Sequence, residues 1–410
     1  MRAASTIVAV APALLLVGCG GAADPRDPGP APLPRVAVVE EPQATAVAVA
    51  VVVPGSTWEL PGTEGLTILS AMTALEAIRP ALDSLAARAR VDCTPAAFTF
   101  TLAAARDGWQ AAVDVFLDGL FRPAPGPEAL ERARSRLMES LTLDQASPAW
   151  QARLAVRHAL HGDTLTSGWL GPACGVPETL SLFDLADVRA GLHRFAPRLA
   201  HAAALAPEGA AVGSLLRQRI QADRTPVIPA PRTVAAGRRY VERNTVTAWL
   251  AVAFPFGLDA DVEAIRLLGA VAEDAIAPGV DHPESFTADH EIVHHGRGGA
   301  LVVRAVTTPA AAADYADRIE AVMARAVRNG VPESVHQRVG RRHRGLRLQA
   351  LATPESRVAA MALDLALGRP PTAWPDLSIP AERLRAAAAA LGPPARSVVG
   401  PGAARRAIRP

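Results

Sequence analysis

The chain has 410 residues and a formal net charge of +2, and aromatic residues make up 4% of it. Half of the residues are hydrophobic, so a chain of this length can bury the cores of two ordinary domains. The near-neutral charge balance gives no argument for nucleic-acid binding.

The first nineteen residues have the pattern of an export signal. Arg2 precedes an apolar run from Ile7 to Val17, and this run is too short to span a bilayer. The stretch that ends in Gly18 and Cys19 resembles the lipobox of bacterial lipoproteins, in which the cysteine becomes a lipidated N-terminus. An ordinary signal peptide with a chance cysteine is the alternative. Because Gly20 follows the cysteine, this resemblance implies the periplasmic side of the outer membrane.

Residues 20–34 are mostly proline, glycine and alanine, a composition typical of a flexible tether. No later apolar run reaches the length of a transmembrane helix. We therefore expect the chain to be anchored to the membrane through Cys19 only.

An internal repeat begins after the tether, at an offset of about 200 residues. "TAVAVAVVVPGS" at 45–56 and "TAWLAVAFPFG" at 247–257 are both β-rich runs that end at proline and a small residue. A helical pattern follows each of them, at 65–78 and 261–276. "PEALERARSRLMESL" and "PESVHQRVGRRHRGL" then match in position, each with proline in its first helical turn.

These matched segments predict two copies of one α+β unit. The segment 222–237 is rich in proline, which excludes regular helix and central strand. We therefore place the first domain at 35–221, a linker at 222–237 and the second domain at 238–410.

The order of the segments resembles that of the insulinase family, which includes pitrilysin and the mitochondrial processing peptidases. The opening "VAVVVPGSTWELPGTEGLTILSAMTALEA" is similar to the start of that family, and "WLAVAFPFGLDADVEAIRLLGAVAEDAI" is similar to the start of its second domain. The resemblance covers the chain from about residue 34 onward. It implies two homologous domains, each a mostly antiparallel sheet with helices packed on it, which face each other across a chamber.

Members of that family that cleave peptides bind zinc through HxxEH on the helix after the Gly-Leu pair. In this chain, Thr67, Ser70 and Ala71 stand at the motif positions. Alanine has no ligand atom, and neutral hydroxyls are poor zinc ligands beside imidazole and carboxylate. Glu139 matches the family's third ligand, but alone it is better interpreted as a solvated helix carboxylate. The resemblance therefore implies a first domain that has lost its zinc site, with no catalytic residue.

The stretch HEIVHH at 290–295 contains the pattern HExxH, which binds zinc when it lies on a helix. Here β-branched Ile292 and Val293 stand in its middle and "GRGG" follows, which predicts a β-hairpin. On a strand, His290 and His294 would be roughly 13 Å apart, too far to share one zinc at about 2 Å each. A zinc peptidase that uses His290, Glu291 and His294 is therefore only a minor alternative.

Other residues carry weaker signals. The arginine-rich stretch 338–347 is typical of a solvated helix face, with an anionic partner site as the alternative. Tyr240 and Tyr315 do not lie in the setting in which the family's substrate-gripping tyrosine would stand. Cys93 and Cys174 remain after lipidation, and an exported location permits a disulfide between them.

The sequence leads to two main functional hypotheses. The first is a non-catalytic insulinase-like lipoprotein, a pseudopeptidase that pairs with a catalytic HxxEH subunit or with itself and forms part of a peptide-binding chamber. The second is a standalone envelope lipoprotein that binds peptides or proteins as a scaffold. Neither needs a cofactor or a nucleic acid.

Overall fold

The fold is described from a computed structural model of the chain. The structure describes residues 35–54, 59, 62–162, 175, 177–220, 237–295 and 298–408. These residues belong to one compact unit, and none of their helices is long and apolar enough to cross a membrane. The predicted signal, Cys19, the tether and nearly all of the predicted linker lie outside the described residues, so the domain boundaries stay predictions.

The first half of the chain contains five strands and seven α-helices among the described residues. In chain order these are β1 (Val36–Glu40), β2 (Ala46–Pro54), α1 (Leu66–Ser84), β3 (Arg88–Cys93), β4 (Ala97–Ala105), α2 (Trp109–Phe121), α3 (Pro127–Ala146), α4 (Pro148–His161), α6 (Pro177–Leu180), α7 (Leu185–Leu192), β5 (His201–Ala206) and α8 (Gly209–Arg219). A short 3-10 helix, η1 (Pro197–Leu199), precedes β5.

The second half follows the same plan. Its elements are β6 (Arg238–Glu242), β7 (Ala248–Phe256), α9 (Val262–Asp274), β8 (Ser285–His295), β9 (Gly298–Thr307), α10 (Ala312–Asn329), α11 (Glu333–Ala350), α12 (Pro354–Ala366), α13 (Ala381–Ala389), β10 (Ala395–Gly400) and a 3-10 helix, η2 (Gly402–Ile408).

The two sheets have the same strand order. The first is β1-β5-β2-β4-β3 and the second is β6-β10-β7-β9-β8. The pairs β1–β5 and β6–β10 are parallel, and the other pairs are antiparallel. The prediction of an α+β fold built from two similar, mostly antiparallel units is therefore confirmed.

Both faces of the central strands are buried, which explains why these strands are continuous apolar runs. Alternate residues of a strand point to opposite faces. In β2, the valines at 47, 49, 51 and 53 pack into the core of the first half, with α1 and α2. The residues between them, Ala48, Ala50 and Val52, belong to a second apolar cluster on the opposite face.

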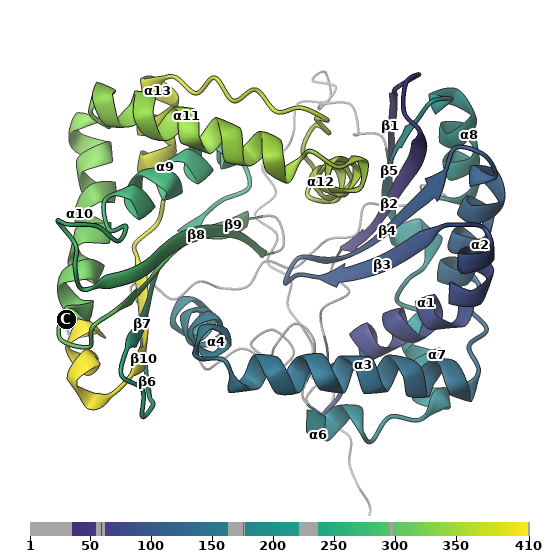
Figure 1. Cartoon of the computed structure of the whole chain (residues 1–410), viewed down its shortest axis with the longest axis horizontal. Coiled ribbons are helices and arrows are strands. Elements are labelled where there is room, and N and C mark those ends of the chain that lie inside the picture. The colour runs from purple at the N-terminus through teal and green to yellow at the C-terminus, as the bar shows by residue number, and fades with distance from the viewer. Residues whose placement is uncertain are drawn as a thin grey trace, which may run out of the picture. The chain divides into compact units, whose positions relative to one another are not determined.

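Each second face is covered by a helix from the other half of the chain. Helix α12 packs on β2, β5 and β4, with Val358 and Met361 against the alanines of β2. Helix α4 packs on β10, β7 and β6, with Val156 and Leu160 against Ala251. Figure 1 shows α12 beside β2 and β5, and α4 beside the strands of the second sheet. The halves therefore exchange one helix each.

A buried arginine reinforces one of these contacts. Arg357 of α12 forms an ion pair with Glu41, which follows β1, at 2.6 Å. Its guanidinium also lies over the ring of Trp374, 4.9 Å from the centroid. The charge of this buried arginine is thus matched by a residue of the first half, which ties α12 to that sheet.

The buried His201, at the start of β5, makes stability depend on pH. Burial lowers the pKa of His201 from 6.5 to about 4, and the charge of Arg35 acts in the same direction. The unfolded chain therefore takes up a proton near pH 6.5 that the folded protein does not accept until about pH 4, so stability falls as the pH drops through this window. Over this window, protonation of the unfolded chain at His201 lowers the free energy of unfolding by about 3 kcal/mol.

We expect His201→Leu to reduce this acid destabilisation, measured by urea unfolding between pH 7 and pH 4.5. The exposed His193, which directly follows α7, provides the control, and His193→Gln should leave the pH dependence unchanged. An equal pH dependence in His201→Leu and the unaltered protein would contradict the assignment.

Candidate functional site

A glutamate fixes the start of α1, the helix that carries the predicted degenerate zinc motif. The carboxylate of Glu59 accepts hydrogen bonds from the backbone N–H groups of Gly65, at 2.5 Å, and Thr67, at 2.6 Å. Gly65 has a φ of 92°, a left-handed conformation that favours glycine. A carboxylate at the first turn also complements the helix dipole. The motif positions are therefore held in a defined place.

The three motif positions are enclosed by protein. Thr67, Ser70 and Ala71 are 1%, 0% and 0% exposed. The Ser70 hydroxyl donates to the carbonyl of Leu66 at 2.7 Å. Helix α7 lies so close that a Cβ at Gly191 would clash with the Ser70 hydroxyl oxygen. The structure thus places the backbone of α7 against this face, and leaves no open space at Ser70.

An arginine hydrogen-bonds to the Thr67 hydroxyl, the second hydroxyl at the three motif positions. Arg194 donates from Nη1 to the Thr67 hydroxyl at 3.1 Å. Glu139, the predicted match to a third metal ligand, is exposed on α3. The structure brings Thr67, Ser70 and Ala71 together on one buried face and leaves Glu139 in solvent, as its interpretation as a solvated carboxylate predicted.

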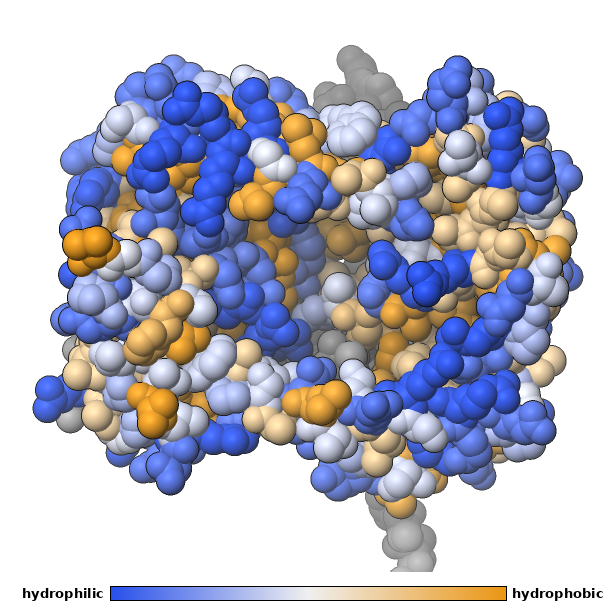
Figure 2. All heavy atoms as spheres, in the orientation of Figure 1, coloured by the Kyte–Doolittle hydropathy of each residue, from blue (hydrophilic) through white to orange (hydrophobic). Residues whose placement is uncertain are grey.

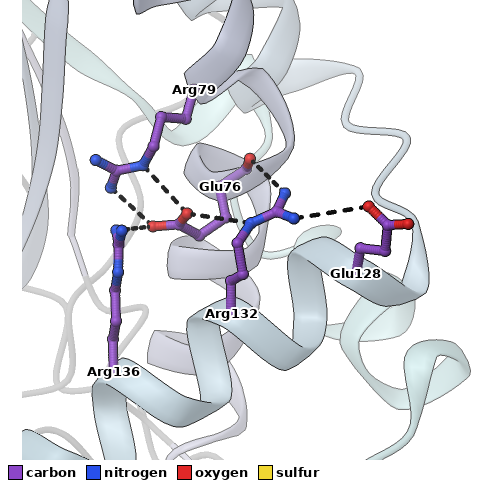
Figure 3. A network of polar contacts seen from close by, with 5 residues as sticks. All are labelled: Glu76, Arg79, Glu128, Arg132 and Arg136. Atoms are coloured by element: carbon purple, nitrogen blue, oxygen red, sulfur yellow. Dashed lines mark hydrogen bonds and ion pairs between the residues drawn. The ribbon is translucent and has the colours of Figure 1, made fainter.

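A buried carboxylate that sequence reasoning missed lies further along α1. Glu76 is 2% exposed and meets three arginines, as Figure 3 shows. Arg79 contacts it at 2.7 Å, Arg132 of α3 lies at 3.7 Å, and Arg136 of α3 forms a further ion pair. Arg132 also pairs with Glu128 at 3.7 Å. The network joins α1 to α3. The signal in the sequence that could have indicated this network is a glutamate on an otherwise apolar helix face.

We expect Glu76→Gln to lower the free energy of unfolding by about 1 to 3 kcal/mol, because it removes charge-assisted hydrogen bonds between the two helices. The arginine side chains are about half exposed, so water can solvate them and limits the loss. Chemical denaturation measures this effect. Glu128→Gln is the control within the same network and should not shift the midpoint. Equal effects of the two substitutions would contradict the role assigned to Glu76.

The HEIVHH stretch forms part of a β-hairpin. Strand β8 pairs with β9 antiparallel, with His290 opposite Val303 and His294 opposite Gly299. The predicted hairpin is confirmed. The minor alternative, a zinc peptidase that uses HExxH, is wrong because the motif requires a helix.

His290, Glu291 and His294, the residues of the HExxH pattern, have separate partners. His290 contacts Glu273 of α9, with 2.7 Å between Nδ1 and Oε2. Glu291 accepts from Arg304 of β9 at 2.8 Å. The buried His294 lies against the ring of Phe256, and burial holds its pKa well below 6.5. Across the part of the chain that the structure describes, no group of three histidine, cysteine or acidic side chains is arranged to hold a metal ion.

The remaining candidates have structural surroundings or lie outside the described residues. Tyr240 donates its hydroxyl to the carbonyl of Gly400 at 3.0 Å, and Tyr315 is buried in the second core. Cys174 is not among the described residues, so its disulfide with Cys93 stays a prediction.

The arginine-rich stretch 338–347 lies on α11, and its face is only partly solvated. Figure 2 shows hydrophilic residues gathered where α11 lies in Figure 1. Three of the arginines form ion pairs with acidic residues of α9: Arg338 with Asp274, Arg342 with Glu273, and Arg347 with Glu263. Arg341 and Arg344 are exposed. The prediction of a solvated face therefore holds for only part of the stretch.

Comparison with known proteins identifies the fold. No protein-family model and no curated protein sequence matches the chain. Among solved structures, the peptidase M16 inactive domain from Pseudomonas fluorescens is similar, with a TM-score of 0.72 and 16% identity over 89% of this chain and 95% of that one. A protease from Helicobacter pylori has a TM-score of 0.68 and 11% identity over 89% and 96%.

A chain of Complex III2 from Candida albicans also has a TM-score of 0.68, with 13% identity over 89% of this chain and 93% of that one. The similarities extend over nearly the full length of each neighbour. The chain therefore has the two-unit fold of M16 peptidase-like proteins, as its resemblance to the insulinase family implied.

Proposed function

We propose that this chain is a non-catalytic insulinase-like protein that pairs with a catalytic subunit carrying HxxEH and contributes one wall of a peptide-binding cavity. The observation that carries the proposal is the face of α1. A methyl group and two hydroxyls stand at the motif positions, and α7 and Arg194 cover them. A hydrolytic zinc site needs imidazole or carboxylate ligands and an open position for water, and this face offers neither.

Two of the structural neighbours support this proposal. One is an inactive domain of an M16 peptidase, and another belongs to a multi-subunit complex. The fold thus occurs in a domain described as inactive and in a chain that is part of a larger assembly. We infer from this similarity in fold that the chain acts as the partner of a catalytic subunit.

The edge strands support binding of a peptide or a second subunit. β3 and β8 end their sheets, and β8 is 11 residues long. An edge strand presents unpaired backbone N–H and C=O groups to which an extended segment can add. Such binding needs no metal, and either a partner subunit or a peptide could use these edges.

Reconstitution tests the pairing. The purified chain is mixed with an HxxEH subunit of the same fold from the same genome, and mass in solution and peptide hydrolysis are measured. We expect a stable complex, and cleavage faster than with the catalytic subunit alone. A catalytic subunit whose HxxEH glutamate is replaced by glutamine is the control and should form the complex without cleaving. A chain that stays monomeric and leaves the rate unchanged would contradict pairing and favour the standalone scaffold.

We also propose that the chain is exported and held at the outer membrane by lipid on Cys19. This proposal is supported by the sequence of residues 1–20 alone. A single chain of lipid gives marginal binding, whereas several acyl chains anchor a protein stably. Mass spectrometry of the N-terminal peptide tests it: the expected peptide begins at acylated Cys19, and an intact signal or an unmodified cysteine would contradict the proposal.

A further inference from the structure

A pocket of about 170 Å³ lies between α9, β8 and α11 in the second half of the chain. Ala270, Val339, Leu346 and Ala350 supply apolar walls, and arginine, histidine and glutamate side chains supply the polar part. A cavity of about 150 Å³ has room for a molecule the size of benzene. The pocket can therefore accept one small organic group that has both an apolar and a polar part.

Arg266, which lines this pocket, has less hydrogen bonding than a guanidinium requires. Among the described residues it makes no hydrogen bond: its Nε is buried and lies 3.5 Å from a carboxylate oxygen of Glu263, an ion pair that does not have hydrogen-bond geometry. The carboxylate of Glu263 is already engaged by Arg347, at 2.9 to 3.3 Å. A guanidinium has five N–H donors, and its side chain here is only 27% exposed. An anionic acceptor in the pocket would complete its hydrogen bonding.

The surrounding charges leave a positive surplus. Arg342 and Glu273 form a balanced pair at 2.6 Å. Besides that pair, the charges that act on Arg266 most strongly are those of two arginines and two acidic residues: Arg347, Arg369, Glu263 and Asp364. Three cations, Arg266 included, against two anions leave one positive charge. One monovalent anion would neutralise the cluster.

His290 gives the pocket a second oriented polar group. Its Nδ1 is held by Glu273 at 2.7 Å, and its ring packs closely on Gly269 of α9, where a Cβ would come within 2.5 Å of the ring. The ring is therefore fixed, and Nε2 is the nitrogen left for a bound molecule. This is the role we assign to the first histidine of HEIVHH.

We propose that this pocket binds a carboxylate carried by a small aliphatic group, with the carboxylate on Arg266 and the aliphatic part against Ala270 and Val339. The single surplus charge and the apolar walls favour such an anion over inorganic phosphate, which has more charge and no apolar part. A free branched-chain acid and the C-terminal residue of a peptide share this chemistry. The proposal is independent of pairing with a catalytic subunit.

Calorimetric titration of the full chain with four probes tests the proposal and separates the two sources. The probes are isovalerate, isoamyl alcohol, a short peptide that ends in leucine, and the same peptide as its C-terminal amide. We expect isovalerate to bind at least about tenfold more tightly than the alcohol, the difference that 1.4 kcal/mol gives. Tighter binding of the peptide than of its amide would identify a peptide C-terminus as the ligand, and binding of isovalerate alone would identify a free acid.

Variants locate the binding. Arg266→Met removes the charge and keeps an apolar stem, and Ala270→Leu fills the pocket while leaving the charge in place. Each should weaken isovalerate binding at least about tenfold. Arg344→Gln, on the exposed face of α11, is the control and should not change it. If the acid binds no better than the alcohol, or if Ala270→Leu binds isovalerate as the unaltered chain does, the proposal is overturned, whatever the outcome of the reconstitution.

Discussion

Replacing Thr67, Ser70 and Ala71 by histidine, glutamate and histidine restores the letters of HxxEH but should yield no zinc site and no folded protein. The three positions are almost completely buried, and α7 lies against Ser70 through Gly191. The larger side chains overpack this contact, and the glutamate would be a buried charge. We expect a loss of about 5 kcal/mol or more, which is comparable to the whole stability of many domains.

Soluble expression, thermal unfolding and zinc content measure this result. Ser70→Ala is the matched control, because it removes only the hydroxyl that donates to the Leu66 carbonyl. It should fold and unfold almost as the original chain does. A triple variant that is as stable as the original and holds one zinc per chain would show that the α1 face is open.

The exchanged helices predict that the two halves unfold together. Met361 belongs to α12 of the second half but packs on β2 of the first. Met361→Ala should cost about 2 to 5 kcal/mol, the usual loss when a large buried side chain is truncated. The loss should appear as reduced amide protection in β2 and β5 as well as in α12.

Leu160→Ala in α4 makes the reciprocal test, with reduced protection in β7 and β10. Leu348→Ala on α11 is the control, because Leu348 is exposed and its truncation creates no cavity. Hydrogen exchange and calorimetry follow both variants. Two separate thermal transitions, or a loss confined to the half that carries the substitution, would contradict the exchange.

Local sequence patterns predicted much of the fold. The valine-alanine alternation of β2 and the β-branched residues of HEIVHH identified strands because strand propensity and period are local properties. The repeat placed those strands in two similar units. The surface on which a helix packs depends on residues that are distant in the sequence. The apolar face of α12 indicates that the helix packs on another element, but not that this element is the sheet of the first half.

In the candidate sites, too, local properties could be predicted from the sequence and contacts between distant residues could not. Loss of the zinc ligands could be predicted from residues 67, 70 and 71, since it depends on side-chain chemistry alone. The contacts of Glu76 with α3 and the incomplete hydrogen bonding of Arg266 depend on residues more than fifty positions away. Such contacts arise only when the helices are packed, so the only signal for them in the sequence is a charged residue on a mostly buried helix.

The most direct test of the account is zinc content together with peptide hydrolysis for the purified chain alone, beside a Glu291→Gln variant. We expect no stoichiometric zinc and no cleavage in either protein, because the α1 face is sealed and HEIVHH lies on a strand. One zinc per chain, with cleavage that the Glu291 change abolishes, would contradict both the hairpin role of HEIVHH and the proposed non-catalytic function.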